Sequence, residues 1–175
     1  MFTYTRAPFS ITFLPVDPAS AAEIICWEYP PPYDVYNLAT ENPRTKKAAI
    51  AYILEPSNHF YVMKRGDGRL LAFCSYGQDA QVLGGNYQEE ALDIGLGVHP
   101  DFTGHGWGHW FASAALAFGC TLFPAAKARV TIAQFNVRAQ KVWQKVGFEP
   151  VQQFCSLYDN RPFILMQKCL SPQLE

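Results

Sequence analysis

The chain has 175 residues, of which 14 are basic and 15 acidic, so its formal net charge at pH 7 is −1. A protein that neutralises nucleic-acid phosphates is expected to carry a basic face, so this composition argues against nucleic acid as a partner. The length corresponds to about one domain with its own core. We therefore predict a single domain over residues 1–175.

The first half of the chain predicts a strand, two helices and a hairpin. A strand is expected at Ile11–Val16, followed by a helix that Asp17 caps and that runs to about Trp27, before the prolines at 30–32. A second helix is expected at Thr45–Glu55. Two strands at 60–64 and 69–76 flank the turn Arg65–Gly68, which is a hairpin signal.

The second half continues to alternate between strands and helices. The remaining elements are a strand at 91–98, a helix at 109–122, a strand at 129–133, a helix at 136–146 and two strands at 148–154 and 163–168. Gly147 follows the last helix, where glycine commonly ends a helix. The order β-α-α-β-β-β-α-β-α-β-β predicts an α/β layer protein with a mixed sheet.

The cysteines and the apolar runs bear on where the protein works. Five cysteines, an odd number without a CxxC motif, favour reduced thiols in a cytoplasmic protein. The most apolar run, Phe111–Phe123, is shorter than the roughly 18 residues that span a bilayer, so we expect no membrane segment. Charged residues make up only 17% of the chain, which favours an apolar surface for a pocket or a partner, such as a second copy in a homodimer.

A glycine-rich turn lies between the strand at 91–98 and the helix at 109–122. Val98 ends the strand, Pro100 stops it, and Gly104, Gly106 and Gly108 lead into the helix. Glycines allow backbone N–H groups to approach a phosphate at a helix N-terminus, which is typical of a pyrophosphate site. The segment matches neither the P-loop nor the dinucleotide fingerprint. The alternative is a tight connection without a ligand.

A second motif, Asn136-x-x-Ala139-x-x-x-Trp143-x-x-x-Gly147-Phe148, lies on and just after the later helix. Together with Val98-x-Pro100 and the glycine turn, it resembles the GNAT superfamily of acyl-CoA-dependent N-acyltransferases. The resemblance covers nearly the whole chain. It implies a mixed, mostly antiparallel central sheet with helices on both faces.

The resemblance also implies acetyl-CoA as co-substrate, and it assigns cofactor contacts. The implied contacts are Leu96, Gly97 and Val98 for the pantetheine arm, Thr103, Gly104, His105, Gly106, Trp107, Gly108 and His109 around the pyrophosphate, and Asn136, Ala139 and Trp143 on the later helix. Thr103 stands where the family usually has Arg or Gln. Asn136 fits a plain helix N-cap equally well, and Trp143 also fits a core position on the apolar stripe.

Acyl transfer to an amine needs a base, an oxyanion donor and a route for the leaving thiolate. Asp93 is a carboxylate in an apolar stretch, and burial would raise its pKa toward that of a useful base. The alternative for Asp93 is an internal hydrogen-bond partner, and water can also carry the proton. By resemblance, the backbone N–H near Val98 is the oxyanion donor. The family often has a tyrosine acid where Trp143 stands, so Tyr158 is our candidate acid, with Tyr33 and Tyr36 as substitutes.

The segment between the first two helices is the candidate acceptor site. Its aromatic residues Trp27, Tyr29, Tyr33 and Tyr36 offer flat apolar surfaces, and the prolines stiffen it. A packed surface loop is the alternative. His105 and His109 lack a clear third ligand, so we predict no metal. The resulting hypothesis is acetyl transfer to a primary amine of a small molecule or peptide, and the rival is a non-catalytic acyl-CoA-binding or sensing module.

Overall fold

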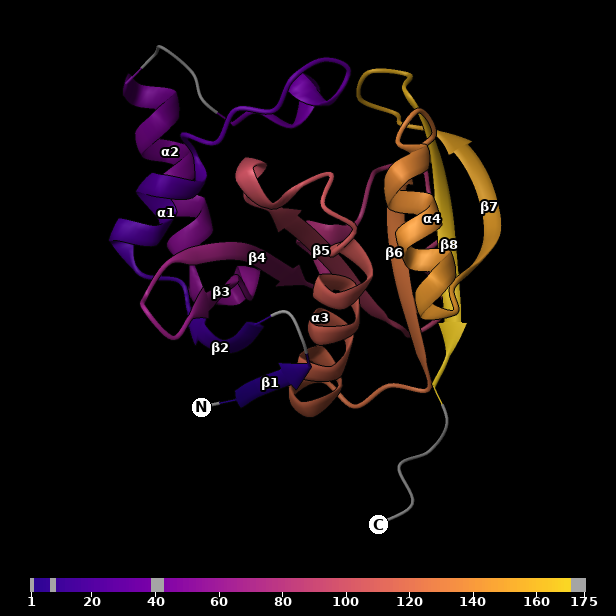
Figure 1. The fold of residues 1–175 in the computed structure, drawn as a ribbon. Helices are drawn as coiled ribbons and strands as arrows, with labels where there is room; N and C mark the ends of the chain where they lie inside the picture. Colours follow the sequence, from indigo (N-terminus) through magenta and orange to yellow (C-terminus); the bar gives the residue numbers. More distant parts are fainter. Residues whose placement is uncertain (1, 7–8, 39–42, 171–175) are drawn as a thin grey trace. The chain divides into compact units, whose positions relative to one another are not determined.

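The computed structural model describes residues 2–6, 9–38 and 43–170 (Figure 1). The chain divides into two compact units. Unit 1 comprises Met1–Ser75 and Leu96–Trp107, and unit 2 comprises Tyr76–Gly95 and Gly108–Glu175. Two strands, β4 and β5, begin in one unit and end in the other. Each unit is described below by itself.

The described residues form eight strands and four α-helices. The strands are β1 (Phe2–Arg6), β2 (Phe9–Pro15), β3 (Tyr61–Arg65), β4 (Leu70–Tyr76), β5 (Leu92–Val98), β6 (Lys127–Ala133), β7 (Glu149–Cys155) and β8 (Pro162–Cys169). The helices are α1 (Pro18–Ile24), α2 (Pro43–Leu54), α3 (Gly108–Leu122) and α4 (Val137–Val146), with short 3₁₀ helices η1 (Tyr33–Tyr36), η2 (Pro56–Asn58), η3 (Gln78–Ala80) and η4 (Pro100–Phe102). The strand order is β1-β2-β3-β4-β5-β6-β8-β7. The β5–β6 pair is parallel, whereas β1–β2, β2–β3, β3–β4, β6–β8 and β7–β8 are antiparallel, which confirms the predicted mixed, mostly antiparallel α/β fold.

Unit 1 is built on an antiparallel meander of β1 to β4. Its core combines the buried faces of α1, α2, β3 and β4 with the start of the predicted acceptor segment. The buried members are Ala21, Ile24, Ile25, Trp27, Ile53, Phe60, Val62 and Leu70. The hairpin β3–β4 confirms the Arg65–Gly68 turn prediction.

Two predictions for unit 1 were incomplete. The strand β1 was missed, although Phe2 and Tyr4 alternate with Thr3 and Thr5 at the two-residue period of a strand. The helix α1 starts at its predicted cap, where Asp17 Oδ1 accepts from the Ser20 N–H at 2.8 Å, but it ends at Ile24 instead of about Trp27. The chain turns there through 3₁₀-type bonds, because the Cys26 N–H donates to the Glu23 carbonyl.

Unit 2 is organised around β6. This strand pairs with β8 along its whole length, whereas its parallel pairing with β5 covers Leu92↔Ala128 and Asp93↔Arg129. The helix α4 has the predicted ends: Asn136 Oδ1 accepts from the Ala139 N–H at 3.0 Å, and Gly147 adopts a left-handed φ of 96°. A Cβ on Gly108, the first residue of α3, would lie 2.7 Å from Val142 Cγ2 in α4, so the close helix contact requires glycine there.

Candidate active site

The predicted phosphate turn follows β5 and η4, and its residues up to Trp107 belong to unit 1, whereas Gly108 and His109 belong to unit 2. Gly104 and Gly106 adopt left-handed φ angles of 82° and 80°, which glycine accepts without strain. Among the described residues, apart from the two chain neighbours of each glycine, no heavy atom lies within 4 Å of the place where a Cβ would stand at either residue. The turn therefore requires glycine for its backbone conformation, and the space beside both α-carbons is open for a ligand.

Side chains fix this turn to the rest of unit 1. Phe102 is buried, and the Arg69 guanidinium stacks over its ring at 4.7 Å. Arg69 also forms an ion pair with Asp101 at 2.8 Å. The Thr103 hydroxyl donates to the Pro100 carbonyl at 2.9 Å, so this hydrogen bond is local to the turn. Thr103 thus has a structural partner at the position where the family usually has a basic or amide side chain.

Two aromatic side chains follow the glycines. The rings of His105 and Trp107 lie 5.2 Å apart and are tilted by 30°, and Trp107 also lies against Phe102 at 6.2 Å. His105 is exposed and Trp107 is half-buried. The turn therefore presents open backbone beside an accessible aromatic surface.

The end of β5 is closely packed on one side. The Phe73 ring lies where a Cβ of Gly97 would be, so this position admits only glycine unless the ring moves. Leu96, Gly97 and Val98 are all half-buried. The His99 N–H donates to the Leu71 carbonyl of β4 at 2.9 Å, which holds the strand end in register with β4.

The predicted acceptor segment, residues 27–36, contacts this strand end within unit 1. Trp27 is 5% exposed, and its ring lies 5.1 Å from His99 and 5.7 Å from Phe73. The Tyr29 hydroxyl donates to the Val98 carbonyl at 2.9 Å. The structure thus brings Trp27 and Tyr29 to Val98 and His99. Two further acceptor candidates stand on η1, Tyr33 half-buried and Tyr36 37% exposed.

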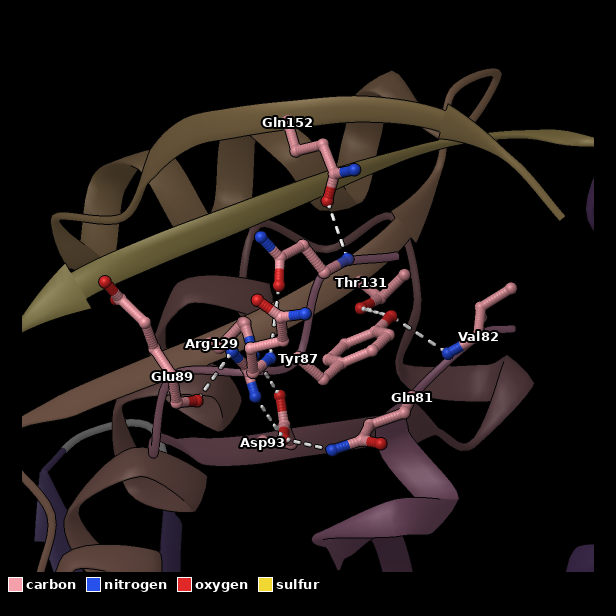
Figure 2. Close-up of polar contacts among 10 residues, drawn as sticks. Gln81, Val82, Tyr87, Glu89, Asp93, Arg129, Thr131 and Gln152 are labelled. Atoms are coloured by element: carbon pink, nitrogen blue, oxygen red, sulfur yellow. Dashed lines mark hydrogen bonds and ion pairs between the residues drawn. The ribbon is translucent and has the colours of Figure 1, made fainter. Parts of the chain in front are cut away.

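Asp93 lies in unit 2, in a buried ion pair with Arg129 (Figure 2). Arg129 donates from Nε to Oδ1 at 2.5 Å and from Nη2 to Oδ2 at 2.8 Å, and the Gln81 amide donates to Oδ2 at 2.7 Å. The hydrogen bond to Asp93 raises the pKa of the Arg129 guanidinium above its ordinary value. Both carboxylate oxygens accept charged or amide donors. This geometry favours the internal hydrogen-bond role for Asp93 over the role of a base.

A wider polar network around Arg129 was not foreseen from the sequence. Its guanidinium lies over the Tyr87 ring at 4.8 Å and donates to the Glu89 carbonyl at 3.1 Å. The Tyr87 hydroxyl accepts from the Val82 N–H and bonds Thr131 Oγ1, both at 2.9 Å (Figure 2). These contacts fasten the segment between β4 and β5 onto β6.

The same network borders an open hollow of about 330 Å³ in unit 2. Its lining residues are Asn86, Glu89, Arg129, Val151, Gln152, Leu165 and Gln167. The side chain of Gln152, labelled in Figure 2, accepts from the Asn86 N–H at 2.8 Å. Most of the lining side chains are polar, and the oxygens of Asn86 and Gln152 accept from backbone N–H groups of the loop.

The other predicted site residues of unit 2 range from buried to fully exposed. Trp143 is buried, with its ring 4.8 Å from Phe148 in an edge-on contact. Asn136 serves as the N-cap of α4, and Ala139 is half-buried one turn later. The candidate acid, Tyr158, is 92% exposed in the β7–β8 turn. His109 is exposed at the start of α3, and no three His, Cys, Asp or Glu residues of the described chain could together hold a metal ion.

None of the helices formed by residues 2–6, 9–38 and 43–170 is long and apolar enough to cross a membrane.

Among solved structures, the fold is similar to a chimaeric spermidine N-acetyltransferase from Vibrio cholerae, with 13% identity, a TM-score of 0.71 and coverage of 91% of this chain and 95% of that one. It is also similar to a protein from Bordetella pertussis assigned to the GnaT-family acetyltransferases, with 12% identity, a TM-score of 0.68 and coverage of 97% and 100%. No curated protein matches the sequence.

A comparison with family models identifies the family of the chain. Residues 20–148 match the model of the acetyltransferase (GNAT) family, which is well over half of the chain. The match extends from α1 through α4 and so includes β5, the glycine turn and the helix with the second motif. With this match, the chain is established as a member of the GNAT family of acetyltransferases.

Proposed function

We propose that this acetyltransferase moves an acetyl group from acetyl-CoA to a primary amine by direct attack in a ternary complex. The observation that carries the proposal is the turn after β5, where Gly104 and Gly106 hold left-handed conformations with open space beside them. That arrangement suits a pyrophosphate, which binds exposed backbone N–H groups. Acetyl-CoA supplies an acetyl group activated as a thioester.

In this proposal, residues of unit 1 do most of the binding and positioning. The turn from Gly104 to Trp107 binds the pyrophosphate through its backbone. Leu96 to Val98 align the pantetheine arm, and the Val98 N–H stabilises the oxyanion that develops on the acyl oxygen. The half-buried Val98 carbonyl is held by Tyr29, so the strand end is fixed before any ligand arrives.

The proposed proton transfers depend on the surroundings of the candidate base and the candidate acid. Asp93 accepts hydrogen bonds from Arg129 and Gln81, so we propose that water removes the amine proton. A thiolate with an intrinsic pKa near that of cysteine, about 8.5, can leave with solvent help alone. The candidates for a protein acid are the exposed Tyr158, with Tyr33 and Tyr36 as substitutes.

One observation favours the rival, a non-catalytic acyl-CoA-binding module. Trp143 stands where the family often has a tyrosine acid, and it is buried against Phe148. An indole N–H donates hydrogen bonds but does not supply a proton at useful cost. The rival predicts tight CoA binding without turnover.

The amine acceptor is the second substrate of the proposed reaction. One of the similar structures is a chimaeric spermidine N-acetyltransferase, so polyamines belong in any first panel of acceptors. Glu28 and Asp34 are exposed on the acceptor segment and could attract an ammonium group. We propose a primary amine in general, on a small molecule or a peptide.

The test is the initial rate of thiol release from acetyl-CoA with a panel of polyamines, amino acids, peptides and aromatic amines. Direct attack in a ternary complex predicts an amine-dependent rate and intersecting lines when both substrates are varied. Parallel lines would indicate a covalent acetyl-enzyme and contradict direct attack. CoA binding by calorimetry with no thiol release for any amine would favour the rival.

A further inference from the structure

The peptide between Val98 and His99 is held from two sides. Its N–H, on His99, donates to the Leu71 carbonyl of β4 at 2.9 Å. Because the N–H and C=O of one trans peptide point in opposite directions, the Val98 carbonyl points away from β4. On that side, it accepts the Tyr29 hydroxyl at 2.9 Å. A side chain of the acceptor segment therefore completes the hydrogen bonding of the strand end.

Tyr29 is itself fixed by a residue eight positions later. Asn37 Oδ1 accepts from the Tyr29 N–H at 2.7 Å, and Asn37 Nδ2 donates to the Tyr29 carbonyl at 3.3 Å. One amide side chain thus closes residues 29–37 into a loop by bonding both backbone groups of Tyr29. The ring of Trp27, 5.1 Å from His99, adds an apolar contact beside this hydrogen bond.

We infer that Tyr29 is a positioning residue for acyl transfer, held in place by Asn37. In an extended strand, the N–H and C=O of one residue face the same side, so the Val98 N–H faces the side on which Tyr29 binds. The inference rests on the proposed function, in which this N–H is the oxyanion donor. Such a donor acts only when it is held close to the productive geometry. The Tyr29 hydroxyl supplies that restraint from the acceptor side.

The test is Tyr29→Phe, which removes one oxygen and keeps the ring. Loss of the restraint is expected to lower kcat and kcat/KM together by about tenfold, equivalent to about 1.4 kcal/mol, because the interaction acts on the transition state. The affinity for CoA is expected to stay unchanged. Tyr52→Phe is the matched control, because Tyr52 is an exposed tyrosine of unit 1 on α2, where its ring contacts Phe60.

Hydrogen exchange supplies a readout that does not depend on activity. In Tyr29→Phe, and in Asn37→Ala, exchange of the amides in residues 29–37 is expected to accelerate, while exchange in the hairpin β3–β4 stays constant. Unchanged exchange in both variants would show that the tether is not formed in solution and would overturn the inference. Faster exchange with an unchanged kcat would also overturn it, because the tether would then have no effect on the reaction.

Failure of the proposed function gives a different pattern. If the native protein releases no thiol with any amine, acyl transfer itself is refuted, and the inference falls with it, whatever exchange reports about the tether. If the native protein is active and only Tyr29→Phe is tenfold slower, both are supported. If Tyr52→Phe is equally slow, the effect is not specific to the Val98 carbonyl and the inference is wrong.

Discussion

Replacing Asp93 by Asn separates a structural carboxylate from a catalytic one. Asp93 and Arg129 are each only 3% exposed, and the guanidinium donates to both carboxylate oxygens. Asn keeps the shape of the side chain but removes the charge and turns one acceptor into a donor. The substitution therefore leaves the Arg129 guanidinium buried without its counter-ion.

The expected cost is large because the partner remains buried. Removing one member of a buried ion pair destabilises proteins by about 3–5 kcal/mol. For a chain of about this size, each kcal/mol shifts the melting temperature by about 2–4 °C, so the expected loss is about 6–20 °C. Changing both partners to apolar residues, Asp93→Leu with Arg129→Met, removes the orphaned charge and is expected to recover most of this loss.

The assay is a thermal melt followed by circular dichroism, together with kcat measured well below both melting temperatures. Glu89→Gln is the control, because it is an acid-to-amide change in the same network at an exposed ion pair with Lys127, and little change is expected. The reasoning is refuted if Asp93→Asn melts like the native protein. If kcat of the Asp93→Asn variant falls by about 10²–10⁴-fold and the acidic limb of its pH–rate profile disappears, Asp93 is the base.

Three further predictions follow from the turn, the helix contact and the first cap. Gly106→Arg is expected to abolish CoA binding in calorimetry. Gly68→Arg is the control, because Gly68 has a similar φ of 86° but lies in a hairpin turn, and it is expected to keep CoA binding. If both variants lose CoA binding equally, the cause is general unfolding and not the phosphate turn. Gly108→Ala is expected to lower the free energy of unfolding in urea by about 1–3 kcal/mol, because the new Cβ meets Val142. Adding Val142→Ala to the same chain is expected to recover part of this loss. If the losses of the two single variants simply add in the double variant, the packing argument is wrong. Asp17→Ala is expected to cost about 1 kcal/mol at pH 7 through the lost cap. Hydrogen bonds from Lys64 and the Ser20 amide lower the pKa of Asp17 from 3.8 to about 2. The stability from the cap is therefore fully present above pH 4 and is lost as the pH falls through 2. If the difference in unfolding free energy between Asp17→Ala and the native protein does not shrink over this range, the cap is not its cause.

The parts of the fold with a local signal could be predicted from the sequence. The start of α1 at Asp17, and the start and end of α4 at Asn136 and Gly147, depend on hydrogen bonds that span three or four residues. All three of these helix ends lie where the sequence pattern predicts. The glycine turn could likewise be located, because a left-handed backbone needs glycine. The strand β1 had an equally local signal in its alternating residues.

The parts that depend on distant pairing could not be predicted. Asp93 meets Arg129 only because β5 and β6 pair in one parallel register across 36 residues. The contact of Tyr29 with Val98 spans 69 residues and depends on how the acceptor segment folds back on β5. Burial alone suggested a base at Asp93, and the charge partner that satisfies this carboxylate has no local signature.

The central claim is acetyl transfer to an amine, and it is tested most directly by measuring both products of one reaction. The protein is incubated with acetyl-CoA and an accepted amine, and free CoA thiol and acetylated amine are quantified together by mass spectrometry. The account predicts equal amounts of the two products, both absent when the Gly106→Arg variant replaces the native protein. Thiol release without acetylated amine, or CoA binding without either product, would contradict it.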